Sequence, residues 1–249
     1  MKNIKLTIEY DGTNYHGWQT QINAKAIHDV VSDAINELTG EKIKLIGSSR
    51  TDTGVHAFSQ VANFKTASTI PPEKFSNAIN TLLPKDIIIR ESEEVNADFH
   101  SRYSANAKKY KYVIHNSPVK SAILRNRAFN VAKPLNFKEM KKAAEFFKGE
   151  HDFSAFKSTG GKTKTSVRTI YEIELHRVGH ESNDYLIELE ITGDGFLYNM
   201  VRIIAGTLVE VGLGKIKSSE TGDIILSKDR KRAGKTLPAQ GLYLVEIFY

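Results

Sequence analysis

The chain has 249 residues, of which 40% are hydrophobic, so it can bury a sizeable core in one large domain or two ordinary ones. It contains no cysteine, which excludes disulfides and thiolate chemistry, and no apolar run approaches the roughly 20 residues of a membrane span; we therefore expect a cytoplasmic protein. The net charge is +6, with 11 basic and 13 acidic residues in 1–103 and 24 basic and 16 acidic residues in the remainder, so a polyanionic partner should meet mainly the second half.

The first half of the chain alternates strand and helix patterns. Residues 4–10 alternate apolar and polar side chains, which predicts a half-buried strand. The apolar residues of 26–39 share one helical face, and Gly40 suits the end of that helix. The other elements expected here are a strand at 43–46, a strand at 61–65, a helix at 72–83 and a strand at 87–89.

The second half repeats this order of elements. We expect strands at 110–115, 169–176, 185–191 and 242–248, and helices at 137–148 and 196–211. The fold class is thus α+β: two related β-α-β-β-α-β units of the ferredoxin or RNA-recognition-motif type, with mostly antiparallel sheets flanking a central cleft. The two domains are expected at 1–103 and 104–249.

The run at 50–57, Arg-Thr-Asp-Thr-Gly-Val-His-Ala, is the first candidate for chemistry. Gly54 and Thr53 suit a tight turn, but turn chemistry does not explain Arg50 and Asp52 together. A nearby guanidinium favours an ionised carboxylate, and a permanently ionised aspartate suits a nucleophile. The alternative is an Asx-type turn beside a solvated arginine.

Three other motifs are incomplete. Asp52–Gly54 spells the aspartic-protease triplet, but that class needs two carboxylates that share one proton, so only a dimeric protease would fit. The sequence Gly-Gly-Lys-Thr at 160–163 matches the last part of the phosphate-binding loop motif, but Phe156 stands where that motif needs its first glycine. His176 and His180 are four residues apart without a carboxylate pattern to complete a metal site, so we expect no metal.

Two features of the second half suggest a site. Arg202 lies in an apolar helical stretch, where a guanidinium is costly unless it is paired. Asp52 is one candidate partner, and a position on the wet face of the helix is the alternative. Tyr110 and Tyr112 would point to one side of a strand and Lys111 to the other. We expect one tyrosine to cover the core, and an aromatic platform for a base is the functional interpretation.

Basic residues gather around a loop rich in serine, threonine and glycine, and again at 228–235. The loop residues are Lys157, Lys162, Lys164 and Arg168. Each could simply be solvated, but together in one half they indicate contacts with RNA phosphates. The alternative is an ordinary basic surface.

Several strings occur in an order typical of one enzyme family. They are YDGTNYHGWQ at 10–19, the run at 50–57, FHSR at 99–102, KYKY at 109–112, HDFSAF at 151–156, FL and MVR within 196–202, and PAQGLYL at 238–244. On these strings the whole chain resembles the tRNA pseudouridine synthase A family. It departs at Thr20, where a basic residue is frequent, and at Ser48 and Ser101, where alanine is frequent; Thr20 bears on RNA contacts in the first half.

The resemblance implies that Asp52 is the catalytic aspartate, that Tyr110 contacts the target base, and that Arg202 pairs with Asp52. It implies an isomerase that converts uridine to pseudouridine in the anticodon stem-loop of tRNA, at positions 38, 39 and 40. It also implies a homodimer without cofactor or metal. The expected RNA contacts are Arg50, His56, Tyr110, Lys157, Lys162, Lys164 and Arg168. The alternative is a non-catalytic tandem RNA-binding protein, which would leave Asp52 without a role.

Overall fold

The computed structural model describes residues 1–161, 163–179 and 184–249. The chain divides into two compact units, residues 1–106 with 243–249 and residues 107–242. The last strand, β10 (Leu242–Phe248), therefore belongs mainly to the first unit, where it pairs in parallel with β3 (His56–Thr66). The expected division at 103 and 104 left this strand with the second domain, because a sequence pattern identifies a strand but not its partner. The expected α+β class is confirmed.

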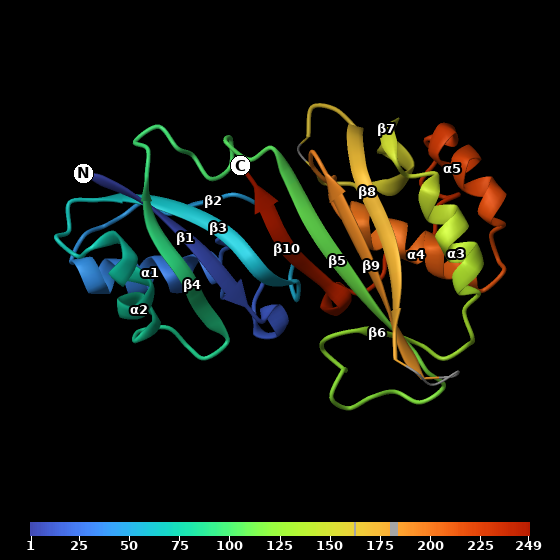
Figure 1. Cartoon of the computed structure of the whole chain (residues 1–249), viewed down its shortest axis with the longest axis horizontal. Helices are drawn as coiled ribbons and strands as arrows, with labels where there is room; N and C mark the ends of the chain where they lie inside the picture. Colours follow the sequence, from blue (N-terminus) through green and yellow to red (C-terminus); the bar gives the residue numbers. More distant parts are fainter. Residues whose placement is uncertain (162, 180–183) are drawn as a thin grey trace. The chain divides into compact units, whose positions relative to one another are not determined.

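The first unit is a sheet with strand order β4-β1-β3-β10, in which β1 lies antiparallel to both β3 and β4 and the short β2 pairs with β3 (Figure 1). Its other elements are β1 (Lys2–Tyr10), η1 (Gly12–Asn14), α1 (Ile27–Thr39), β2 (Ile46–Gly47), η2 (Pro72–Lys74), α2 (Phe75–Asn80) and β4 (Ile87–Val95). Ile4, Leu6 and Ile8 are 0% exposed, as the alternation in β1 predicts. Gly40 ends α1 with a φ of +69°, a left-handed conformation that glycine adopts without strain.

The second unit is a sheet with strand order β5-β9-β8-β7, antiparallel at each step, with β6 parallel to β5. Its elements are β5 (Ala107–Asn116), β6 (Phe129–Val131), α3 (Phe137–Glu145), β7 (Gly149–Asp152), η3 (Phe153–Phe156), β8 (Val167–Val178), β9 (Tyr185–Gly193), α4 (Met200–Gly212), η4 (Ser218–Glu220), α5 (Thr221–Ser227) and η5 (Ala239–Gly241). The strands β6 and β7 add to the expected order because they are too short for a periodic signal.

The helix α4 forms much of the core of the second unit. All of its residues are buried except Arg202 and Glu210. A helix that is apolar on nearly every side must be surrounded by other elements, and α3 and the strand β5 pack against it. The two polar positions are therefore the places where α4 meets polar groups.

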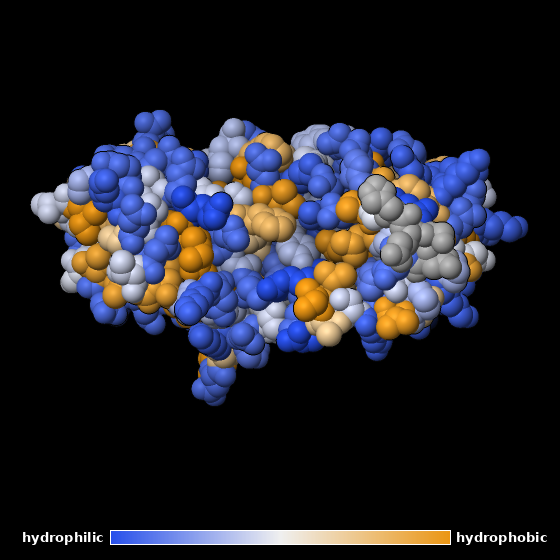
Figure 2. All heavy atoms as spheres, turned by 60° about the horizontal axis from the view of Figure 1, so that its bottom comes forward, coloured by the Kyte–Doolittle hydropathy of each residue, from blue (hydrophilic) through white to orange (hydrophobic). Residues whose placement is uncertain are grey.

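On the face that Figure 2 shows, apolar residues form separate groups between hydrophilic ones. Among the described helices, none is long and apolar enough to cross a membrane.

Candidate active site

Asp52 lies on a tight loop between β2 and β3. The loop turns at Thr53 and Gly54, and Gly54 has a φ of +80°. The main-chain N–H of Val55 donates to the carbonyl of Asp52 at 3.1 Å and closes the turn. Asp52 is half-buried, while Thr51 before it is buried and Thr53 after it is exposed. The carboxylate therefore stands at the edge of the core, where a short loop fixes its main chain.

The segment that follows β1 holds this loop on both sides of Asp52. The N–H of Trp18 donates to the carbonyl of Thr51 at 3.2 Å, and the N–H of Gly54 donates to the carbonyl of Tyr15 at 3.2 Å. The hydroxyl of Tyr10 lies 2.7 Å from Oγ1 of Thr51. These bonds join the strings at 10–19 and 50–57. Sequence reasoning missed this bracing because main-chain bonds leave no mark in residue type.

Two glycines allow the bracing segment to approach the loop closely. A Cβ on Gly12 would lie 2.0 Å from the carbonyl oxygen of Val55, and a Cβ on Gly17 would lie 2.2 Å from that of Thr51. Gly17 also has a φ of +82°. Any larger residue at either position would push the loop away.

His56 is 2% exposed, so its side chain would have to become exposed before it could contact RNA directly. Its Nδ1 accepts from the N–H of Gly12 at 3.1 Å, and its ring stacks on that of Tyr243 with centroids 4.8 Å apart. Oδ1 of Asp11 is also 3.1 Å from Nδ1. A neutral imidazole accepts from Gly12, whereas a protonated one would pair with Asp11. Burial and these contacts indicate that His56 fixes the start of β3.

Arg202 is half-buried on α4 and is paired within the second unit. Its Nε donates to the carbonyl of Leu237 at 2.7 Å, and its Nη1 donates to Oδ1 of Asn199 at 2.6 Å. The main-chain N–H of Leu237 also donates to the carbonyl of Arg202 at 3.3 Å. The expectation that this guanidinium needs partners is met by these two oxygens. A pair with Asp52 would join the two units and stays a prediction.

The segment that carries Leu237 reaches α4 through two more glycines. A Cβ on Gly206 would lie 1.8 Å from the carbonyl oxygen of Lys235, and the N–H of Gly234 donates to Oγ1 of Thr207 at 2.8 Å. Small residues at both points let the main chains touch. The 233–237 segment is therefore fixed on α4 beside Arg202.

Two members of the basic run at 228–235 serve the fold. Lys228 forms an ion pair with Asp152 at 2.9 Å. Arg230 donates through Nη1 to the carbonyl of Gly234 at 2.9 Å and through Nη2 to Oγ1 of Thr236 at 3.1 Å. The net charge of this run therefore predicts more phosphate contacts than its remaining cations can make.

The two tyrosines of β5 differ in their surroundings. Tyr112 is 0% exposed, and its hydroxyl donates to the carbonyl of Pro238 at 2.7 Å. Burial raises the pKa of Tyr112 above its ordinary value, so it stays a neutral donor in the core. Tyr110 is 7% exposed, and its ring meets that of Phe196 edge to face at 5.1 Å between centroids. Contact between Tyr110 and the target base stays a prediction.

The basic loop between η3 and β8 presents exposed cations. Lys157 and Lys164 are exposed, and Nζ of Lys157 donates to Oγ of Ser166 at 2.9 Å. Arg168 is half-buried and donates to the carbonyl of Thr165 at 3.2 Å; Lys162 lies outside the described residues. A hollow of about 220 Å³ opens here. Its lining is Lys157, Ser158, Thr159, Gly160, Gly161, Thr163, Leu197 and Tyr198.

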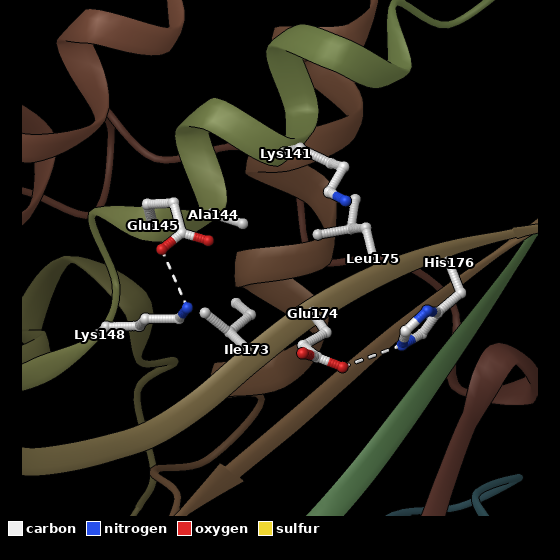
Figure 3. A pocket seen from close by; sticks show the side chains of 8 residues that line it. All are labelled: Lys141, Ala144, Glu145, Lys148, Ile173, Glu174, Leu175 and His176. Carbon is white, nitrogen blue, oxygen red and sulfur yellow. Dashed lines mark ion pairs between the residues drawn. The ribbon is translucent and has the colours of Figure 1, made fainter.

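A second hollow, of about 120 Å³, lies between α3 and β8 (Figure 3). Lys148 pairs with Glu145 at 2.9 Å, the ring of His176 lies 3.1 Å from the carboxylate of Glu174, and Lys141 also lines the hollow (Figure 3). Carboxylates among the cations make it a poor phosphate site. His180 lies outside the described residues, and within the described part no group of three His, Cys, Asp or Glu residues could hold a metal ion.

A family model described as tRNA pseudouridine synthase matches residues 6–104 and 143–249. The match covers most of both units, including Asp52, the segment that braces its loop, and Arg202. The chain belongs to the tRNA pseudouridine synthase family. The enzyme class expected from the resemblance is thereby confirmed, and the non-catalytic alternative is not supported.

Three relatives agree with this assignment over their whole length. The proteins named tRNA pseudouridine synthase A in Acetivibrio thermocellus and Ruminiclostridium cellulolyticum are 59% and 58% identical to this chain, with all of each chain covered. That of Thermoanaerobacter sp. is 52% identical at the same coverage. Among solved structures, a chain in the crystal structure of a Cbf5-Nop10-Gar1 complex has a TM-score of 0.38 and 10% identity, over 96% of this chain and 57% of that one. So low a score carries no weight here.

Proposed function

We propose that this protein isomerises uridine to pseudouridine in the anticodon stem-loop of tRNA, at positions 38, 39 and 40, with Asp52 as the catalytic aspartate. The observation that carries the assignment of Asp52 is the bracing of its loop, since bonds to Thr51 and Gly54 hold the main chain on both sides of it. Such bracing fits a carboxylate that must meet a reacting atom in one fixed position.

The reaction breaks the C1′–N1 glycosidic bond, turns the base, and joins C1′ to C5. The proton leaves C5 and N1 gains one, so substrate and product are isomers and no net oxidation occurs. The step asks for one ionised carboxylate beside the sugar. Asp52 either attacks C1′ covalently or acts as a base at the sugar while the bond breaks. In both routes a nearby guanidinium favours the ionised form, which is the role proposed for Arg50 and Arg202.

The target uridine is stacked in RNA and must be flipped out, which costs a few kcal/mol. Stacking on Tyr110 and contacts with phosphates offset that cost. Because Tyr110 is buried, the base must displace part of what covers its ring. The phosphate contacts are assigned to Arg50, Lys157, Lys162, Lys164 and Arg168. RNA contact by His56 stays a prediction that its burial disfavours.

The first domain accordingly carries the catalytic aspartate, and the basic second domain grips the RNA. Arg202 is proposed to pair with Asp52 when the site is assembled. We further propose a homodimer whose tRNA contacts both subunits, and a cytoplasmic location, where tRNA is abundant.

The test is to incubate the protein with unmodified tRNA transcripts and to map pseudouridine chemically. We expect new pseudouridine at positions 38, 39 and 40. Transcripts with cytidine at those positions serve as controls and should stay unmodified. Tight binding without any pseudouridine would contradict the proposal and favour the tandem RNA-binding alternative. Pseudouridine elsewhere would keep the activity and change its target.

A further inference from the structure

Asn199 has an unusual main-chain conformation directly before α4. Its φ of +62° and ψ of +8° place it in the left-handed region, which strains a residue other than glycine. Its side chain makes no capping bond to the helix. An asparagine that accepts this conformation without capping its helix is available for other contacts.

Both ends of the Asn199 amide are in use. Its Nδ2 donates to Oγ of Ser158 at 3.0 Å, and its Oδ1 accepts from Nη1 of Arg202 at 2.6 Å. The amide therefore joins the basic loop to the guanidinium on α4. Because its donor and acceptor ends differ, it fits between a hydroxyl and a cation in one orientation only.

On the side of the loop, the contact is continuous with the hollow that residues 157–161 and Thr163 line. The N–H of Ser158 donates to the carbonyl of Tyr198 at 3.1 Å, and a Cβ on Gly161 would lie 3.3 Å from that of Tyr198. Hydroxyls and a lysine line the hollow beside the half-exposed ring of Tyr198. This donor set suits an RNA phosphate, and the ring suits a base next to it.

On the side of α4, two anchors fix the plane of the guanidinium. Nε donates to the carbonyl of Leu237, and Nη1 donates to the amide oxygen of Asn199. Two acceptors in different directions restrict a planar guanidinium more than one acceptor does. The contact with Asn199 therefore contributes to the orientation of the whole group, including its other N–H groups.

We propose that Asn199 is a positioning residue, which orients Arg202 for the reaction and couples that orientation to a tRNA backbone segment in the hollow. RNA that orders Ser158 fixes the amide of Asn199, and the amide fixes the guanidinium. This inference rests on the proposed function of Arg202 at the reacting uridine. It assigns a role to a residue that does not itself touch the substrate.

The decisive variant is Asn199→Gly, since glycine adopts the left-handed conformation without strain and removes both bonds. We expect its single-turnover rate of pseudouridine formation to fall about 10-fold or more. Its tRNA dissociation constant should change less than about 2-fold, and its melting temperature should fall only slightly, because relief of the left-handed strain offsets part of the loss of the two hydrogen bonds. Asn23→Gly is the matched control, because Asn23 has a φ of +58° on an exposed turn of the first unit and should keep the full rate.

Asn199→Asp separates positioning from backbone strain. Aspartate keeps an acceptor for Arg202, so we expect a rate well above that of Asn199→Gly. A purely structural role predicts that Asn199→Gly is at least as active as Asn199→Asp, and that order would overturn the inference. A wild-type rate in Asn199→Gly would overturn it too. If wild-type protein makes no pseudouridine, the proposed function fails instead, so the two failures are distinguishable.

Discussion

The hydroxyl of Tyr10 and Oγ1 of Thr51 lie 2.7 Å apart, which ties the last residue of β1 to the residue directly before Asp52. Both side chains are buried, with 3% and 8% exposure. The bond therefore links the first strand of the fold to the loop on which the proposed chemistry depends. It is the side-chain part of a bracing that is otherwise made by main-chain groups.

Tyr10→Phe should loosen this loop without changing the surface that meets RNA. Loss of one buried hydrogen bond costs about 1 kcal/mol of the free energy of unfolding. We expect the single-turnover rate to fall several-fold while tRNA affinity stays the same. Tyr15→Phe is the matched control, because Tyr15 is also a buried tyrosine but its hydroxyl donates to Asp86 instead, at 2.7 Å. Similar rates in the two variants would contradict a special role for the bond to Thr51.

Gly12→Ala tests the close approach of the bracing segment. The new Cβ would lie 2.0 Å from the carbonyl oxygen of Val55, so main chain must move. We expect a loss of about 2 kcal/mol or more in stability and a rate at least about 10-fold lower. Gly40→Ala is the control: its φ is +69°, and apart from Gly40 and its two chain neighbours no atom of the described residues lies within 4 Å of the new Cβ. It should cost about 1 kcal/mol and keep the rate of the remaining folded protein. A wild-type rate in Gly12→Ala would show that the loop position is not critical.

Tyr110→Phe distinguishes stacking from proton transfer. If the ring serves mainly as a stacking surface, the variant keeps partial activity and Tyr110→Ala loses far more. Tyr112→Phe should lower stability, since it loses the bond to Pro238, and leave the chemical step unchanged. Complete inactivity of a folded Tyr110→Phe would make the hydroxyl essential.

Asp152 predicts a pH dependence of stability. The hydroxyl of Ser154 and then the ammonium of Lys228 hold the pKa of this carboxyl below its usual range. The pKa is therefore lower in the folded state than in the unfolded state. The contribution of this ionised carboxylate to the free energy of unfolding is fully present above its unfolded pKa of about 4. It is lost as the pH falls through the lower pKa of the folded state.

The matching variant is Asp152→Asn, measured by chemical denaturation across pH. At pH 7 we expect it to be less stable than wild type by about 0.5 to 1 kcal/mol, since Lys228 is largely exposed. The difference should shrink below pH 4 and vanish at lower pH. A difference that persists unchanged at pH 2 would contradict the assigned cause.

Much of the first unit could be predicted from local patterns. Alternation identified β1, and a helical face followed by glycine identified α1, because burial of one face leaves a periodic mark in the sequence. The parallel partner of β10 left no such mark, since pairing with β3 depends on residues nearly 190 positions away.

The candidate site was predictable to a similar degree. The cost of burying a guanidinium showed that Arg202 needs partners, but the carbonyl of Leu237 and the amide of Asn199 became visible only in the structure. His56 was expected to meet RNA because residue type alone does not reveal that its ring is covered by Tyr243. The main-chain bonds that brace Asp52 were equally invisible.

Ser48 and Ser101 departed from the expected alanines, and the structure shows what their hydroxyls do. Ser48 donates to Oε1 of Gln60 at 2.8 Å, and Ser101 donates to the carbonyl of Ile46 at 2.5 Å. Both side chains are buried and satisfied. The first unit therefore accommodates both hydroxyls without leaving either one unsatisfied.

The central claim is that one carboxylate performs the isomerisation, and Asp52→Asn tests it most directly. The variant keeps the size of the side chain and removes its charge. With an unmodified tRNA transcript in single turnover, we predict no pseudouridine, together with an unchanged melting temperature and tRNA dissociation constant. Formation of pseudouridine by Asp52→Asn at the wild-type rate would contradict the account.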